Sequence, residues 1–107
     1  MISRELIAAS TEPLILSTLQ RGENYGYAIM EKVRAFSTGK IEWTEGMLYP
    51  VLHRLERRGL VKSRWETMES GRKRRYYFLT AKGREALVER RREWLAVHET
   101  LNEAWGA

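Results

Sequence analysis

The residues best suited to chemistry lie in one stretch, residues 44–59, with the sequence TEGMLYPVLHRLERRG. On a helix, one face of this stretch would carry the small residues Gly46 and Pro50 toward its N-terminal end and the polar or basic residues His53, Arg54 and Arg57 toward its C-terminal end. Tyr49 would lie at the margin of this face. Arginine and histidine side chains donate hydrogen bonds, and the small residues allow close approach. This face is therefore suited to entering a groove on a partner molecule.

A second basic feature is the run Arg72, Lys73, Arg74 and Arg75, which follows directly after Gly71. One interpretation is a solvated hairpin whose charges prevent edge-to-edge aggregation. Four consecutive basic residues in one short strand exceed what such protection requires. The run therefore favours a hairpin that contacts phosphates.

The sequence contains little that could support catalysis or metal binding. His53 and His98 are the only histidines, there is no cysteine, and all fourteen acidic residues are glutamates. No GxSxG motif or glycine-rich phosphate loop is present. Glu85, Glu89 and Glu93 are interspersed with arginines and are better explained as helical ion-pair partners than as acid–base pairs. We therefore expect no enzyme, no metal and no cofactor.

The length and composition are typical of a small folded protein. The 107 residues allow one compact domain and one additional long element, and 43% hydrophobic residues with four Trp and five Tyr can form a core. The absence of cysteine, of a long apolar run and of a signal-peptide pattern predicts a cytoplasmic protein.

The positive charge is distributed unevenly along the chain. The net charge is +5, whereas the segment 54–75 alone has nine basic residues against three glutamates, a net charge of +6. Its basic residues are Arg54, Arg57, Arg58, Lys62, Arg64, Arg72, Lys73, Arg74 and Arg75. This concentration indicates an anionic partner.

The stretch 44–59 must form a helix if it is to present these donors together. An apolar stripe at i, i+3, i+4 and i+7 predicts it: Leu48, Val51, Leu52 and Leu55. Thr44 is the expected N-cap and Gly59 the expected C′ residue. Pro50 would cost roughly 3 kcal/mol inside a helix, although its clashing partner four residues earlier is Gly46, which can yield. The alternative is a helix that begins only near Met47.

Two further helices are predicted before this one. Apolar residues from Leu6 to Leu19 indicate a first helix that ends before Gly22. It begins either near Ser3, or at Thr11 with Pro13 in its first turn. A second helix is expected to start at an Asn24 cap and to end at Gly39, followed by an extended piece at residues 40–43.

After Gly59 the period of the pattern changes from 3.6 to 2. Val61, Ser63 and Trp65 alternate with charged residues, residues 68–71 form a turn with Gly71 suited to positive φ, and residues 72–79 are rich in Tyr, Phe and Arg. This pattern predicts a β-hairpin.

Thr80 is expected to cap a last helix that runs from residue 81 to about residue 105. An apolar seam with a period of seven follows this helix and includes Leu87, Trp94, Val97, Leu101 and Ala104. Its partner is either the chain's own first helix or a second copy of the chain. Trp94 and Trp105 either fill this seam or stack a planar aromatic ligand between two chains.

Three groups of residues together resemble the PadR family of transcriptional regulators. They are Tyr25-Gly26-Tyr27, then Gly46-x-Leu48-Tyr49-Pro50-x-Leu52-x-Arg54-Leu55-Glu56-x-x-Gly59-Leu60-Val61, and Tyr76-Tyr77-x-Leu79-Thr80-x-x-Gly83. The resemblance covers roughly residues 14–87. Tyr25 stands where many members have histidine, and Pro13 within the first helix is a second departure.

The resemblance implies a mostly α fold with a small β-hairpin (α+β), a winged helix-turn-helix. Residues 1–79 would form the DNA-binding domain, with a recognition helix at 44–58 and a basic wing at 68–76, and residues 80–107 a C-terminal dimerisation helix. It implies a homodimeric, nucleoid-associated repressor of a palindromic promoter operator, released by a small aromatic or phenolic effector. The alternative is a winged-helix module that binds an acidic protein partner.

These assignments define which residues are expected to contact DNA and which to form the dimer interface. Those expected to contact DNA are Tyr25, Thr44, Gly46, Tyr49, Pro50, His53, Arg54, Arg57, Arg72, Lys73, Arg74 and Arg75. Those expected at the dimer interface are Leu87, Trp94, Val97, Leu101 and Trp105. The two tryptophans are also the candidate residues for binding the effector, the alternative being that they only pack.

Overall fold

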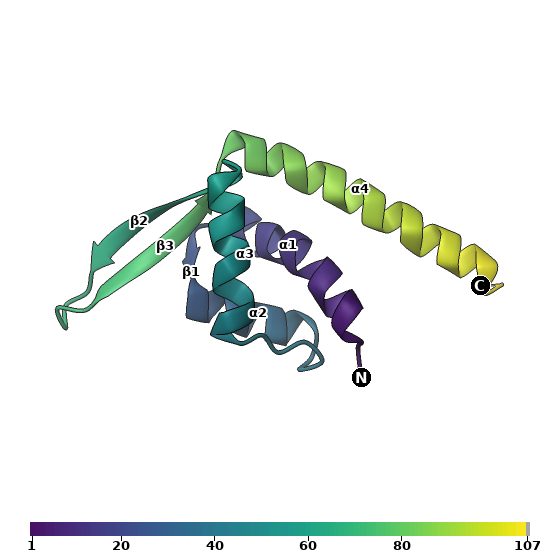
Figure 1. Cartoon of the computed structure of the whole chain (residues 1–107), viewed down its shortest axis with the longest axis horizontal. Helices are drawn as coiled ribbons and strands as arrows, with labels where there is room; N and C mark the ends of the chain where they lie inside the picture. Colours follow the sequence, from purple (N-terminus) through teal and green to yellow (C-terminus); the bar gives the residue numbers. More distant parts are fainter. Residues whose placement is uncertain (107) are drawn as a thin grey trace.

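The computed structural model describes residues 1–106, which form four helices and a three-stranded sheet. In chain order the elements are α1 (Arg4–Gln20), β1 (Asn24–Tyr25), α2 (Gly26–Phe36), α3 (Glu45–Arg57), β2 (Val61–Thr67), β3 (Lys73–Leu79) and α4 (Ala81–Ala104). The molecule measures 56 × 30 × 21 Å, because α4 and the β2–β3 hairpin project from opposite sides of the helical body (Figure 1).

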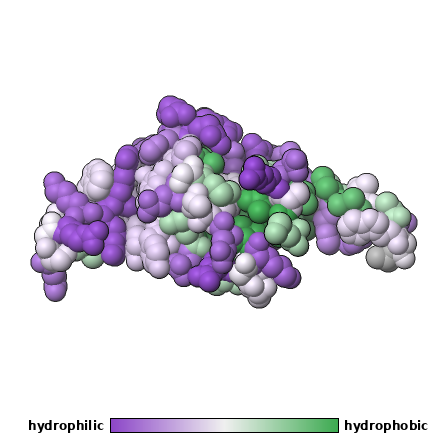
Figure 2. Space-filling model, turned by 60° about the horizontal axis from the view of Figure 1, so that its bottom comes forward, coloured by the Kyte–Doolittle hydropathy of each residue, from purple (hydrophilic) through white to green (hydrophobic). Residues whose placement is uncertain are grey.

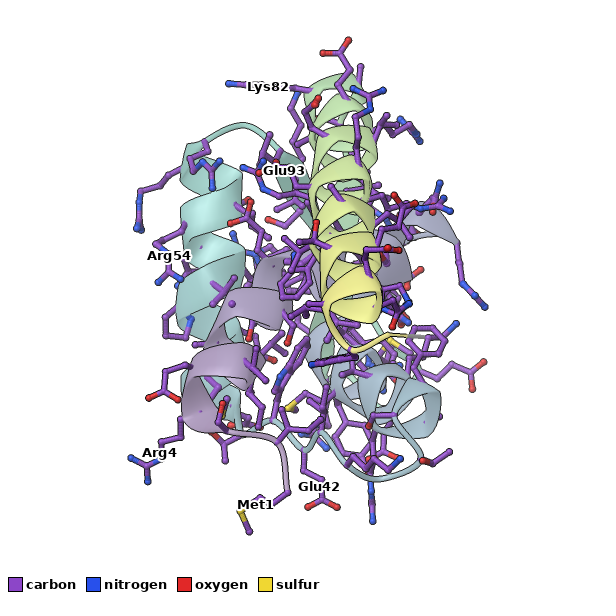
Figure 3. All side chains as sticks on the ribbon, turned by 90° about the vertical axis from the view of Figure 1, so that its right-hand side faces the viewer. Met1, Arg4, Glu42, Arg54, Lys82 and Glu93 are labelled. Atoms are coloured by element: carbon purple, nitrogen blue, oxygen red, sulfur yellow. The ribbon has the colours of Figure 1, made fainter. Side chains whose placement is uncertain are left out.

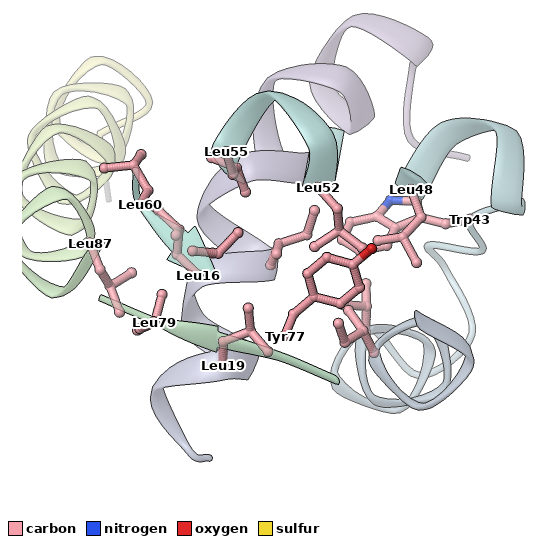
Figure 4. Packing of buried hydrophobic residues seen from close by; sticks show 14 residues of the cluster. Leu16, Leu19, Trp43, Leu48, Leu52, Leu55, Leu60, Tyr77, Leu79 and Leu87 are labelled. Atoms are coloured by element: carbon pink, nitrogen blue, oxygen red, sulfur yellow. The ribbon is translucent and has the colours of Figure 1, made fainter. Parts of the chain in front are cut away.

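The core lies where α1, α2 and α3 meet the sheet (Figure 4). Leu48, Leu52 and Leu55 are completely buried, so the apolar stripe predicted for α3 faces inward as expected. Each such leucine contributes roughly 1.5–3 kcal/mol of burial free energy. Tyr77 on β3 brings an aromatic ring into the same cluster.

The boundaries of α3 confirm the predicted caps. The Thr44 hydroxyl accepts a hydrogen bond from the Met47 N–H (3.3 Å), and Gly59 follows the helix with φ +76°. The helix begins at Glu45 and contains Pro50, so the later start near Met47 is wrong. The carbonyl four residues before the proline belongs to Gly46, but a Cβ added at Gly46 would approach nothing closer than the Thr44 hydroxyl oxygen at 3.7 Å, so the helix accommodates Pro50 without needing the glycine to make room for the ring.

Helix α1 begins at its early alternative start. The Ser3 hydroxyl accepts from the Leu6 N–H (3.3 Å), and Pro13 lies inside the helix. Thr11 is not a cap: it is buried, and its hydroxyl donates to the Ile7 carbonyl at 2.7 Å, which satisfies this polar group within the helix.

The predicted hairpin is confirmed, and Gly71 in its turn has φ +86°. β3 is the central strand of an antiparallel sheet in the order β1-β3-β2, with Ser63 opposite Tyr77 and Trp65 opposite Arg75. β1 was not predicted, and the Asn24 cap is wrong. Asn24 lies in β1, and Tyr25 occupies the N-cap position of α2 without a side-chain hydrogen bond.

Helices α1 to α3 with the flanking hairpin constitute a winged helix-turn-helix, and α4 continues from it as a long C-terminal helix (Figure 1). Within residues 1–106, none of the helices combines the length and apolarity needed to span a bilayer.

Candidate nucleic-acid interface

The exposed side of α3 presents the donors that the sequence placed there. Gly46, Pro50, His53, Arg54 and Arg57 are all exposed. Arg54 projects outward from α3 on the side away from α4 (Figure 3). Among the described residues, neither Arg54 nor Arg57 forms an ion pair with a glutamate. Both guanidinium groups are free to donate to a partner.

Tyr49, at the margin of this face, is held by the start of α2. A Cβ added at Gly26 would lie 2.3 Å from the Tyr49 hydroxyl oxygen and 2.7 Å from Cζ, so the ring occupies space that only glycine leaves open. The Tyr49 and His53 rings lie 6.4 Å apart. Gly26 therefore allows Tyr49 to pack against the start of α2 at the front of α3.

We expect Gly26→Ala to displace the Tyr49 ring while changing the unfolding free energy by about 1 kcal/mol or less, since the ring is the mobile end of a side chain and alanine is favoured in helices. Amide NMR shifts should change mainly at the start of α2 and in the first two turns of α3. In a Tyr49→Ala background the same substitution should no longer destabilise. Equal destabilisation in both backgrounds would contradict this packing.

The four basic residues of the wing divide into two pairs. Arg72 and Lys73, near the tip, are exposed. Arg74 and Arg75 are half-buried and face opposite sides of the sheet because side chains alternate along β3. The Arg74 guanidinium lies 3.9 Å from the centre of the Tyr25 ring on the outer side. Of the four, only Arg72 and Lys73 thus have side chains without a partner within the described residues.

The outer side of the sheet also carries an ion-paired arginine. Arg64 on β2 donates to the Glu23 carboxylate (Nε–Oε2 3.2 Å) and lies over the Tyr76 ring at 4.9 Å. Its hydrogen bond holds the pKa of Glu23 below its ordinary value. Arg64 therefore ties the residue before β1 to the hairpin rather than serving as a free donor.

An open cleft of about 1030 Å³ lies between the hairpin and the front of α2 and α3. Its walls combine aromatic side chains with the tip cations and include Tyr27, Tyr49, His53, Trp65, Arg72 and Lys73. Tyr27 and Trp65 are 62% and 63% exposed and were not predicted as site residues. Alternation placed Trp65 on the inner face of β2, but this part of the strand extends beyond the helices that would bury it.

The comparison with known proteins identifies this architecture. Residues 15–89 match the sequence model described as the transcriptional regulator PadR-like family. The chain belongs to the PadR family. A PadR family transcriptional regulator from Eggerthella lenta is 31% identical with a TM-score of 0.82, and the match covers 94% of this chain and 86% of that one.

Two other relatives extend the comparison. A transcriptional regulator from Clostridium thermocellum is 30% identical with a TM-score of 0.87, and the match covers 96% and 97% of the two chains. Transcriptional regulator Rv3488 of Mycobacterium tuberculosis is 48% identical over 61 residues, which are 57% of this chain and 53% of that protein. PadR-like proteins are transcriptional regulators and not enzymes, in agreement with the expectation from the sequence.

Helix α4 of this PadR-like regulator divides the predicted seam into two parts. Leu87 is 2% exposed and packs in the chain's own core, so it offers no surface to a second copy. Beyond it α4 leaves the body, and the remaining seam residues are exposed, from 37% at Trp94 to 70% at Trp105. Apolar surface gathers where this arm meets the body, whereas the hairpin end is hydrophilic (Figure 2).

Trp94 and Trp105 are eleven residues apart, which is roughly 16 Å along a helix axis. One flat ligand cannot stack on both within a single chain. If the two tryptophans share a ligand, the second ring must come from another copy.

Proposed function

We propose that this PadR-like regulator is a homodimeric repressor that binds a palindromic DNA operator. In each copy α3 enters the major groove, and the wing contacts phosphates. The observation that carries the proposal is the exposed face of α3, on which Arg54 and Arg57 have no ion-pair partner among the described residues. A major groove about 12 Å wide admits one such helix, and arginine donors recognise guanine edges.

The remaining expected contacts take complementary roles in this proposal. Gly46 permits close backbone approach, Pro50 and Tyr49 contact thymine methyls or phosphates, and His53 donates to bases. Thr44 and Tyr25, at the N-cap positions of α3 and α2, lie beside helix ends that attract phosphates. Arg72 and Lys73 contribute affinity rather than sequence choice.

The exposed seam of α4 supports the proposed dimer. In this proposal residues 1–79 bind DNA and residues 80–107 pair two copies through Trp94, Val97, Leu101 and Trp105. The recognition helices are then roughly 34 Å apart, one DNA turn. A planar aromatic or phenolic effector would bind between Trp94 of one copy and Trp105 of the other and release the operator. The regulator would act in the cytoplasm at the nucleoid.

The test is selection of duplexes from a random library followed by titration of the selected DNA in increasing salt. We expect an inverted repeat whose half-sites are about 10 base pairs apart, and affinity that falls by orders of magnitude between about 50 and 200 mM salt. A flat salt response, or selected sequences without a repeat, would reject the proposal.

Binding to an acidic protein is the second candidate, since the exposed rings of Tyr27 and Trp65 could anchor a protein partner. The face of α3 itself offers no such apolar anchor. Competition separates the two functions: poly-glutamate should displace an acidic partner readily, but it should compete poorly with the selected duplex.

Arg57→Ala is expected to weaken binding to the selected duplex by roughly 1–3 kcal/mol if Arg57 reads a base. Binding to unrelated duplexes should then change little. If Arg57 instead holds a phosphate, all duplexes should lose affinity alike. Anisotropy titrations with selected and scrambled DNA measure the difference.

A further inference from the structure

A closed cluster of three side chains joins the C-terminal part of α3 to the hairpin. Arg75 on β3 donates from Nη2 to Glu56 Oε1 (3.1 Å) and from Nε to Ser63 Oγ (2.9 Å). The Ser63 hydroxyl in turn donates to Glu56 Oε2 at 2.6 Å. Each of the three side chains therefore contacts the other two, and together they link α3, β2 and β3.

Two aromatic rings enclose the arginine of this cluster. The Arg75 guanidinium carbon lies 5.5 Å from the centre of the Tyr77 ring and 5.6 Å from that of Trp65. Tyr77 is fully buried, so the cluster is attached to the hydrophobic core of the domain. The planar guanidinium satisfies the carboxylate, the hydroxyl and the rings at once, which lysine could not do.

The outer half of the hairpin depends on such contacts for its orientation. The buried apolar residues of the sheet end at Val61 on β2 and at Tyr77 on β3. Beyond them the strands carry polar, charged or exposed side chains up to the tip. A hairpin without core contacts would vary in its angle to α3 unless polar contacts fixed it.

We propose that Arg75 and Glu56 are positioning residues that hold the wing at a fixed angle to the recognition helix before DNA binds. The advantage of such a fixed angle rests on the proposed function. With the angle already set, α3 and the wing tip can contact one duplex without the entropic cost of ordering the wing on binding. It assigns Arg75 a different role from Arg72 and Lys73. Glu56 already compensates the charge of Arg75, and two nitrogens of the Arg75 guanidinium, Nε and Nη2, donate hydrogen bonds within the chain.

The first experiment needs no DNA. The chain has no cysteine, so spin labels can be attached at Ser70→Cys on the hairpin turn and Glu45→Cys at the start of α3. Pulsed dipolar spectroscopy, with labelled protein diluted into an excess of unlabelled protein, gives the distance distribution between them. Glu56→Gln and Arg75→Gln should broaden this distribution clearly.

The control is Glu66→Gln, which removes a glutamate from the same hairpin whose one ion pair within residues 1–106 is with Arg64, at 3.9 Å, and which has no contact with the cluster. It should leave the distribution as narrow as in the parent. Unchanged widths in both Glu56→Gln and Arg75→Gln would overturn the inference, whether or not the protein binds DNA.

The second experiment uses the sign of the charge change. Glu56→Gln removes a negative charge and should strengthen attraction to DNA if charge alone mattered. We expect it to weaken binding to the selected duplex by roughly fivefold to tenfold instead, because a wing without a fixed angle must be ordered on binding. Tighter binding would overturn the inference.

The salt dependence distinguishes positioning from phosphate contact. Arg75→Gln should also weaken binding, but the slope of log Kobs against log salt should stay as in the parent. Lys73→Gln should reduce that slope by about 0.9, the loss of one phosphate contact. A similar reduction for Arg75→Gln would make it a phosphate ligand and reject its positioning role. Failure of the parent to bind any duplex would reject the proposed function, while the spin-label result would still decide the role of the cluster.

Discussion

Gly83→Ala should lower the free energy of unfolding by about 3 kcal/mol and the thermal midpoint by roughly 10–20 °C. Gly83 lies in the first turn of α4, where a Cβ would be 2.0 Å from the Leu60 carbonyl oxygen and 3.0 Å from its carbon. Both atoms belong to the backbone, which cannot move aside as a side chain can. Thermal unfolding followed by circular dichroism at one fixed protein concentration measures the effect.

The backbone at this junction is held by hydrogen bonds on both sides. The Thr80 hydroxyl donates to the Gly59 carbonyl (2.6 Å) and accepts from the Gly83 N–H (3.0 Å), while the Thr80 N–H donates to the Leu60 carbonyl (3.1 Å). Lys82 adds a contact to the Arg58 carbonyl (3.0 Å). Accommodating a methyl group would break these contacts and shift the whole of α4 relative to α3.

Gly46→Ala provides the matched control, since it is also a glycine-to-alanine change inside a helix. The nearest atom to its added Cβ is the Thr44 hydroxyl oxygen at 3.7 Å, an ordinary contact. Alanine is preferred over glycine within helices by up to about 1 kcal/mol, so this variant should be as stable as the parent or more stable. Similar losses for both variants would show that the close approach at Gly83 is not the cause.

The local signals in the sequence predicted most of the fold. Thr44, Gly59 and the leucine stripe defined α3, because caps and periodicity act within a few residues. The start of α1 stayed open because Ser3 and Thr11 were both acceptable caps, and Pro13 was compatible with either. Tertiary packing decides between the two starts, because Thr11 is buried in the folded chain.

The candidate site was predicted less completely, because its arrangement depends on contacts between distant segments. β1 has only two residues, too few for any periodicity, and it exists because Tyr25 pairs with Tyr76. From the sequence alone, the four basic residues of the wing were indistinguishable in their expected role. Its division follows from the partner that each residue meets in space, Tyr25 for Arg74 and Glu56 for Arg75.

The seam of α4 shows the same limit. A period of seven identified the apolar line but could not say which surface covers it. The structure places Leu87 against the chain's own core and leaves the later positions exposed, since α4 diverges from the body after its first turns. These exposed positions are therefore available for contact with a second copy of the chain.

Leu101→Glu should convert the proposed dimer to a monomer and weaken operator binding by roughly a hundredfold to ten-thousandfold. Leu101 is exposed in the single chain, so the substitution should leave the fold intact. In a two-fold dimer each copy would bury an unpaired carboxylate, and this penalty is incurred twice. Loss of the second half-site removes the gain from bivalent binding, which is typically 10²–10⁴. Light scattering gives the mass, and anisotropy titration gives the affinity.

Ala96→Glu is the control for charge and for helix composition. Ala96 is also exposed on α4, but it lies five residues before Leu101 and therefore about 140° around the helix from Leu101. It should remain dimeric and bind the operator nearly as the parent does, apart from a small repulsion due to the added charge. If Leu101→Glu stays dimeric, the exposed line through Trp94, Val97 and Leu101 is not the contact between copies. If it becomes monomeric but binds with full affinity, the operator is read by one chain at a time, and the inverted repeat loses its physical basis.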